Sequence, residues 1–196
     1  MIGTFKKILI VFGTRPEAIK MCPVVQEFKN RAYFDVKVCS TGQHDIMLDQ
    51  VLKIFRINPD YNLNIMQQTQ TLFDITTAVL NKIQYIMQVE KPDIVLVHGD
   101  TTTSFTTALA AFYNNIPVGH VEAGLRTYDL QQPYPEEFNR QAISIIAKYN
   151  FAPTLQAKTN LEKKSNVNTN TYVVGNTVID ALKTTVQKDF NSNELE

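Results

Sequence analysis

The chain has 196 residues, a length that fits one large domain with at most a small part of another. Hydrophobic residues make up 44% of it, which excludes a disordered chain, and no apolar run is long enough to predict a membrane span. Its 19 basic and 19 acidic residues cancel, which disfavours nucleic-acid binding because such proteins usually carry a basic surface.

Short runs rich in β-branched residues alternate with longer amphipathic stretches, which predicts a parallel sheet covered by helices. The predicted strands are residues 7–12, 35–40, a weak 61–65, 93–98, 117–121, 149–152 and 171–174. The predicted helices are residues 17–30, 46–55, 71–89, 103–113, 136–148, 155–164 and 178–188. Repeated strand–helix units with right-handed crossovers indicate a doubly wound, Rossmann-like α/β fold. We expect residues 1–176 to form this domain and residues 177–196 to begin an interdomain helix with a polar tail.

The two cysteines, Cys22 and Cys39, lack the spacing of metal ligands or of a redox pair. We interpret both as small buried hydrophobic residues in a reducing cytoplasm. Lys6 and Lys7 precede an apolar run at residues 8–12, but this run is too short for a signal peptide. We therefore expect a cytoplasmic protein.

In an open parallel sheet, ligands bind beyond the carboxyl ends of the strands. After the first predicted strand, Gly13 permits a tight turn and Pro16 suits the first turn of a helix. We expect free N–H groups in this turn, with Arg15 beside them, to bind an anion. An ordinary strand-to-helix turn with a surface arginine is the alternative. The three-glycine dinucleotide fingerprint is missing, so we expect no nicotinamide cofactor.

Three acidic residues follow later strands or begin a helix. Asp100 precedes three threonines, where a helix cap is the alternative role. Glu122 leaves an apolar strand, where an unpaired carboxylate is costly, and Glu136 begins a helix, whose dipole favours an acid. If the three carboxylates lie around one crevice, their charges repel one another. At least one should then hold a proton near neutral pH, which suits the set to acid/base chemistry. A metal site is the rival explanation, but the acids lack a tight ligand spacing.

Five ordered motifs are similar to those of the non-hydrolysing UDP-N-acetylglucosamine 2-epimerases. They are FGTRPEAIKM at 12–21, HGDTTT at 98–103, HVEAGLR at 120–126, PEE with NR at 135–140, and GNTVID at 175–180. The resemblance runs from about residue 7 to residue 182. It implies the first domain of a glycosyltransferase-B-like fold, in which two Rossmann-like domains enclose the substrate.

The resemblance also implies interconversion of UDP-N-acetylglucosamine and UDP-N-acetylmannosamine, usually for bacterial surface polysaccharides. In such enzymes UDP leaves by elimination, giving a 2-acetamidoglucal, and then adds back. Asp100, Glu122 and Glu136 match the acid/base carboxylates of the family, and Arg15 matches its active-site arginine. The other substrate-binding residues that we expect by this match are Gly13, Thr14, Thr101 and Arg126. We expect no cofactor and no metal, and we expect the full enzyme to be a homodimer.

In this family a second UDP-N-acetylglucosamine acts as an allosteric activator, and Gln43, His44 and Gln70 match its site. Asp45 and Thr69 stand where many relatives have arginine, which weakens attraction for a diphosphate. A helix-start or surface histidine is the alternative for His44.

The second domain of the family supplies most nucleotide contacts and a catalytic histidine, and we expect it to be missing here or supplied by a complementing chain. Two alternatives therefore stay open. One is a non-catalytic remnant or an assembly module of a split enzyme. The other is a hydrolysing epimerase, which releases free N-acetylmannosamine.

Overall fold

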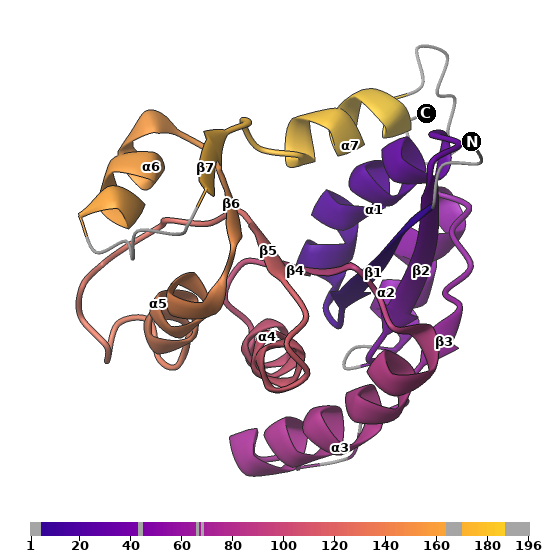
Figure 1. Ribbon diagram of the computed structural model, residues 1–196, viewed down its shortest axis with the longest axis horizontal. Helices are drawn as coiled ribbons and strands as arrows, with labels where there is room; N and C mark the ends of the chain where they lie inside the picture. The colour runs from indigo at the N-terminus through magenta and orange to yellow at the C-terminus, as the bar shows by residue number, and fades with distance from the viewer. Residues whose placement is uncertain (1–4, 43–44, 66, 68, 164–169, 187–196) are drawn as a thin grey trace, which may run out of the picture.

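The computed structural model describes residues 5–42, 45–65, 67, 69–163 and 170–186 (Figure 1). Its strands are β1 Lys6–Phe12, β2 Phe34–Ser40, β3 Tyr61–Asn62, β4 Ile94–His98, β5 Val118–Val121, β6 Tyr149–Ala152 and β7 Asn170–Val173. They form one parallel sheet in the order β3-β2-β1-β4-β5-β6-β7. The strand order reverses between β1 and β4, which confirms the predicted Rossmann-like fold and places the ligand crevice of such sheets at this point.

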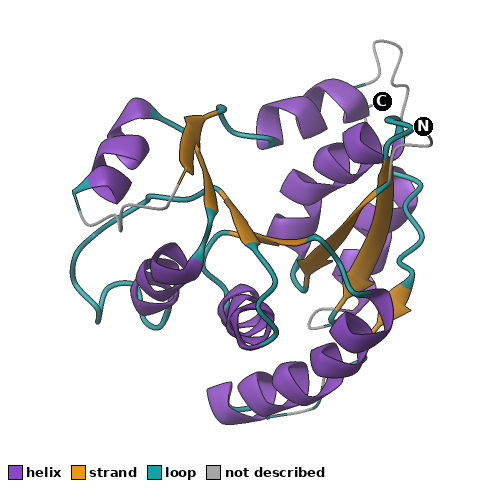
Figure 2. Cartoon of the chain, in the orientation of Figure 1, coloured by secondary structure: helices purple, strands orange, loops and turns teal. Residues whose placement is uncertain are grey.

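Helices cover both faces of the sheet (Figures 1 and 2). They are α1 Arg15–Lys29, α2 Asp45–Ile54, α3 Leu72–Glu90, α4 Thr102–Tyr113, α5 Glu136–Ile146, α6 Leu155–Glu162 and α7 Val178–Thr185. Buried side chains of α1, α2 and α7 join one hydrophobic cluster, and those of α3, α4 and α5 join another. The sheet therefore separates two cores, and α6 adds a small third cluster near the β6–β7 edge.

The sequence of β1 explains why it lies at the centre of the sheet. Its apolar run is buried on both faces, as expected for a strand between two helical layers. Leu9 faces the α3–α4 core, whereas Ile10 faces the α1–α2 core. Ile10 pairs in register with Val38 of β2 and with Leu96 of β4.

The predicted elements are all present, and most of their ends agree within two residues. Helix α1 begins earlier than predicted because Thr14 and Glu17 form a reciprocal capping box. The strand predicted at 61–65 ends at Asn62, and Asn64 has a positive φ of 46° that extended chain does not adopt. Helix α7 ends at Thr185, and residues 187–188 of its prediction lie outside the described residues.

The two cysteines are buried in the two cores, as predicted, and neither forms a disulfide. Burial raises the pKa of each thiol, Cys22 and Cys39, to about 12. Both therefore stay in the unreactive thiol form near neutral pH. Within the described ranges, no helix combines the length and the apolar character that crossing a membrane requires.

Candidate active site

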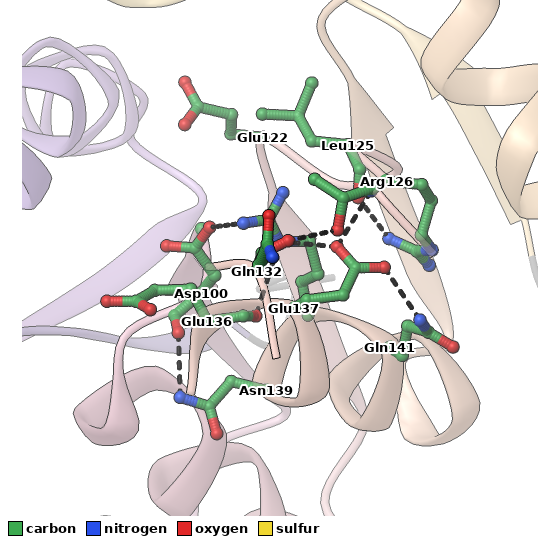
Figure 3. A network of polar contacts seen from close by, with 12 residues as sticks. Asp100, Glu122, Leu125, Arg126, Gln132, Glu136, Glu137, Asn139 and Gln141 are labelled. Carbon is green, nitrogen blue, oxygen red and sulfur yellow. Dashed lines mark hydrogen bonds and ion pairs between the residues drawn. The ribbon is translucent and has the colours of Figure 1, made fainter. Parts of the chain in front are cut away.

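The candidate acids lie at the carboxyl ends of neighbouring strands, beside the β1–β4 switch point. Asp100 follows β4, Glu122 follows β5, and Glu136 is the first residue of α5. Figure 3 shows the side chains of Asp100 and Glu136 next to each other, with Glu122 across from them. The structure thus brings together the three carboxylates that the sequence singled out.

The turn after β1 differs from the expectation of free N–H groups. The buried Glu17 carboxylate accepts hydrogen bonds through Oε2 from the backbone N–H groups of Gly13, at 3.0 Å, and Thr14, at 2.7 Å. An anion site built on these two N–H groups was therefore the wrong prediction for this turn. The capping box explains the error, because its acidic residue reaches back to the start of the helix and takes the donors.

Glu17 also joins this turn to the loop after β4. Its Oε1 atom accepts hydrogen bonds from the hydroxyls of Thr101 and Ser104, both at 2.8 Å. One buried carboxylate thus accepts four hydrogen bonds from two loops, which fixes their separation. The sequence analysis missed this residue as part of the site, although the Thr14–Glu17 spacing is itself a recognisable capping-box signal.

Gly13 has a steric role at the same turn. A Cβ atom placed on it would lie 2.1 Å from Thr41 Oγ1 and 3.0 Å from Thr103 Oγ1. The turn after β1, the end of β2 and the start of α4 therefore approach one another more closely than any side chain at position 13 permits.

Asp100 is not the cap of α4. Thr101 is the N-cap, and its hydroxyl accepts from the Ser104 N–H at 3.0 Å. The Asp100 carboxylate instead forms a 2.9 Å ion pair with Arg140 of α5, and Asn139 donates to its backbone carbonyl at 2.9 Å. Asp100 therefore does not cap α4, which was the alternative role for it.

Burial raises the pKa of Asp100 above its ordinary value. The Arg140 guanidinium opposes this shift, whereas the charges of Glu136 and Glu122 add to it. This direction agrees with the expectation that neighbouring carboxylates favour protonation of one of them. Arg140, a second residue that the sequence analysis missed, lies within the PEE–NR motif quoted for the resemblance.

Glu122 occupies a strained position, since its φ is 60°, in the left-handed region that non-glycine residues seldom adopt. Lys20 of α1 donates to both of its carboxylate oxygens, at 2.8 and 2.6 Å. The side chain of Asn176 donates to Oε2 at 3.1 Å. The carboxylate therefore has the partners that its partly buried position requires, and Lys20 and Asn176 join the site as further residues that the sequence analysis had not assigned.

Glu136 and Glu137 are adjacent in sequence but have different surroundings. The Oε2 atom of Glu136 is buried and has no hydrogen-bond partner among the described residues, which leaves it available to a ligand. Glu137 is fully buried and accepts from the N–H groups of Thr127 and Tyr128, both at 3.1 Å. Burial alone would raise the pKa of Glu137, but these hydrogen bonds outweigh it and the pKa is lowered. Glu137 therefore fixes the loop after β5, while Glu136 lies beside Asp100 (Figure 3).

The two arginines predicted to bind substrate have different environments. Arg126 donates to Leu125 O at 2.8 Å and to Ser144 Oγ at 2.7 Å, and its side chain points away from Asp100 in Figure 3. Burial lowers the pKa of Arg126. Arg15 lies at the start of α1 with its side chain exposed.

Of the three residues matched to the allosteric site, the structure describes Gln70. Gln43 and His44 lie outside the described residues. Gln70 donates a hydrogen bond to the backbone carbonyl of Ile65, and the preceding Thr69 has a positive φ of 56°. Gln70 thus lies two residues before the start of α3, with its side chain bonded to the main chain.

Two buried histidines, His98 and His120, lie in β4 and β5, the strands that precede Asp100 and Glu122. His98 Nε2 is 3.8 Å from Glu122 Oε2, and neither ring nitrogen has a hydrogen-bond partner within the described part of the chain. Burial, with the Lys20 charge adding to it, lowers the pKa of His98 to about 3. Burial likewise lowers the pKa of His120 to about 4, although its 2.6 Å contact with Gly99 O opposes the shift. Both rings are therefore neutral near pH 7.

A metal centre was the rival explanation for the acids. In the described ranges, no group of three or more His, Cys, Asp or Glu side chains is arranged as metal ligands. The cations that the structure places against the carboxylates are Arg140 and Lys20.

Comparison with known proteins identifies the family to which this arrangement belongs. Residues 26–195 match the family model of UDP-N-acetylglucosamine 2-epimerase. The chain belongs to the UDP-N-acetylglucosamine 2-epimerase family. The predicted resemblance, made from five motifs, is thereby confirmed.

Relatives and solved structures in this family are close to the chain. A UDP-N-acetylglucosamine 2-epimerase of Campylobacter jejuni is 56% identical over 177 residues, which are 90% of this chain and 46% of the relative. The crystal structure of the Neisseria meningitidis enzyme bound to UDP-GlcNAc superposes with a TM-score of 0.88 and 54% identity, covering 91% of this chain and 48% of that one.

A more distant structure, of the Methanocaldococcus jannaschii epimerase in complex with UDP-GlcNAc and UDP, gives a TM-score of 0.84. It is 39% identical, and the match covers 90% of this chain and 48% of that one. The chain spans about half the length of the relatives it matches. These isomerases are therefore about twice as long as the chain.

Proposed function

We propose that this chain supplies the acid/base residues of a UDP-N-acetylglucosamine 2-epimerase, which converts UDP-N-acetylglucosamine to UDP-N-acetylmannosamine. The observation that carries the proposal is the meeting of Asp100, Glu122 and Glu136 at one crevice in a chain of this family. The substrate assignment is supported by the relatives, two of which were solved with UDP-GlcNAc bound.

The reaction requires removal of a weakly acidic proton from C2 of the sugar as UDP departs from C1. Positioned acids and bases must make these transfers, because neither step is fast in water. The raised pKa of Asp100 suits it to hold and donate a proton, while Glu122, paired with Lys20, offers a carboxylate that can accept one. Protonation of C2 from the opposite face of the 2-acetamidoglucal, as UDP adds back to C1, then completes the change of configuration at C2.

The contacts around Glu17 decide how this chain would bind substrate. Because Glu17 occupies the N–H groups of Gly13 and Thr14 and the hydroxyl of Thr101, these three residues would act mainly by shaping the crevice. Arg15 is exposed, so it is the cation of this loop that can reach a diphosphate. Arg126 would act indirectly, through the loop that it fixes to Ser144.

The complete enzyme would contain a second domain, since the relatives are about twice as long. We propose that this domain binds the nucleotide and closes over the crevice, as in a glycosyltransferase-B-like fold, and that the enzyme works in the cytoplasm on surface-polysaccharide precursors. We also propose an activator site for a second UDP-N-acetylglucosamine at Gln43, His44 and Gln70.

We further propose that the complete enzyme is a homodimer. Helices α3 to α5 expose several large apolar side chains, as an oligomer interface would. These side chains are Phe73, Phe112, Phe138 and Ile145.

The decisive experiment is proton NMR in D₂O with UDP-N-acetylglucosamine, comparing the 196-residue chain with a version extended by the second half of a relative. We expect deuterium at C2 and UDP-N-acetylmannosamine only with the extended protein. Free N-acetylmannosamine as the product would instead indicate a hydrolysing epimerase. No exchange with either protein, although both are folded, would favour the non-catalytic alternative.

A further inference from the structure

Asn176 lies in the short segment between β7 and α7, and its side chain makes two hydrogen bonds in different directions. Its Nδ2 donates to Glu122 Oε2 at 3.1 Å. Its Oδ1 accepts from the backbone N–H of Val178, the first residue of α7, at 3.0 Å. Gly175, with φ of 79°, precedes it and allows the chain to turn here. One amide therefore joins a candidate acid to the start of a helix.

The other attachment of helix α7 is its packing on α1. Thr177, its N-cap by position, makes no side-chain cap hydrogen bond. Ala181 is the buried residue of the helix within the described ranges, and it packs in the cluster that contains Ala18 and Met21 of α1. Ile179 and Leu182 are exposed. The position of α7 thus depends on its packing against α1, in which Ala181 is buried, and on the two hydrogen bonds of Asn176.

The same helix α1 also supplies Lys20, which binds the other side of the Glu122 carboxylate. Glu122 is therefore held by two side chains, from α1 and from the segment that leads into α7, and these two helices pack on each other. Movement of α7 relative to α1 would separate Asn176 from the carboxylate.

We propose that Asn176 is a positioning residue that couples the seating of α7 on α1 to the orientation of the Glu122 carboxylate. When α7 is seated, the amide holds Oε2 and the carboxylate keeps the orientation seen here. When α7 leaves α1, Glu122 loses this donor. The evidence for the coupling is the two hydrogen bonds of Asn176. Only the consequence of the coupling for catalysis depends on the proposed function.

The coupling is tested by amide hydrogen exchange of α7 in the 196-residue chain, followed by NMR. Asn176→Asp retains an oxygen that can cap Val178 but replaces the donor with a second carboxylate beside Glu122. We expect the protected amides of α7 to exchange roughly 10-fold faster in this variant. In the double variant Asn176→Asp with Glu122→Gln, the new glutamine amide can donate to the new carboxylate. We expect this reversed pair to restore most of the protection.

Thr184→Ala is the matched control, because among the described residues the Thr184 hydroxyl donates only within α7, to Asp180 O. If Asn176 were merely a helix cap, Asn176→Asp would exchange like the wild type. Equal protection in the wild type and in Asn176→Asp, or no recovery in the double variant, would overturn the proposal. A chain without epimerase activity would still show the expected pattern, so the result is independent of the proposed function.

Discussion

The Glu17 carboxylate accepts a 2.8 Å hydrogen bond from the Ser104 hydroxyl, which joins the first turn of α1 to the first turn of α4. The same Ser104 hydroxyl also donates toward His98 O, at 2.6 Å, so its proton is shared between the two acceptors. The two turns are therefore parts of one buried polar network with Glu17 at its centre.

We predict that Glu17→Gln destabilises the fold by about 2–4 kcal/mol. The glutamine side chain has an NH₂ group in place of one carboxylate oxygen, and this group cannot accept hydrogen bonds, so two of the four donors lose their acceptor. Urea unfolding followed by circular dichroism measures the change. Glu27→Gln is the matched control, since Glu27 lies on the same helix with an exposed ion pair to Arg31. A loss below about 1 kcal/mol in Glu17→Gln would contradict the network that the structure shows.

A second prediction concerns the close approach at Gly13. Gly13→Ala would place a methyl group 2.1 Å from Thr41 Oγ1, so we expect a loss of about 1–3 kcal/mol from overpacking. The Thr41 hydroxyl is buried and has no hydrogen-bond partner among the described residues, so its removal costs little. The double variant Gly13→Ala with Thr41→Ala should therefore be more stable than Gly13→Ala alone. Additive losses in thermal unfolding would show that this contact is not the cause.

A third prediction addresses the acids. In a protein extended by the second domain, Asp100→Asn, Glu122→Gln and Glu136→Gln should each lower kcat by roughly 10²-fold or more, the usual effect of removing a positioned acid or base. Glu162→Gln, on the partly exposed α6 and outside the crevice, should retain normal turnover. Wild-type turnover in any one of the three would remove that residue from the proposed mechanism.

A fourth prediction follows from the buried histidines. The folded pKa values of about 3 for His98 and about 4 for His120 lie below the ordinary value of 6.5, so the unfolded chain binds protons more readily. Their contribution to stability is complete above about pH 6.5 and is lost as pH falls toward these values, by about 3 kcal/mol for each at pH 4.5. Asp100, whose pKa is raised, acts in the opposite sense.

Urea unfolding at pH 7 and pH 4.5 tests this dependence. His120→Gln, whose amide can still donate to Gly99 O, should lose less stability between the two pH values than the wild type does. An unchanged difference would mean that His120 takes up its proton without unfolding.

A fifth prediction concerns the activator site proposed from the resemblance. In the extended protein, His44→Ala should raise the concentration of UDP-N-acetylglucosamine needed for activation, while kcat at saturation stays within a few fold. Steady-state kinetics with both nucleotide sugars measures this. Hyperbolic kinetics in the wild type would show that Asp45 and Thr69 have already removed the response.

The periodic part of the fold could be predicted from the sequence because its signals are local. The continuous apolar run of β1 and the three-to-four-residue spacing in α3 each identify their element. The end of β3 could not be predicted in this way, since it depends on the positive φ of Asn64.

The candidate site was predictable in its acids but not in their partners. Asp100 and Glu122 are visible because each follows a strand, which brings it to the crevice in any sheet of this class. Lys20 is 102 residues from Glu122, and Arg140 lies in α5 whereas Asp100 lies in the loop after β4, so no local pattern joins them. The expectation of free N–H groups at Gly13 failed for a different reason. The spacing of Thr14 and Glu17 is a local capping-box signal that predicts an acceptor for these donors, and it had been given no role.

The strand order has a consequence for the time course of folding. Residues of β1 to β3 and α1 to α3 are all synthesised before β4, yet β1 must pair with β4 to complete the sheet. Such non-local pairing is slow, since a long loop has to close before the contact forms. Lys20 lies in the helix after β1, and Glu122 follows β5, on the other side of the β1–β4 pairing. Their ion pair therefore cannot exist in a nascent chain that lacks β5. Arg140 is synthesised after Asp100, so chaperones or proteases that act on a chain ending before α5 meet Asp100 without its counter-charge.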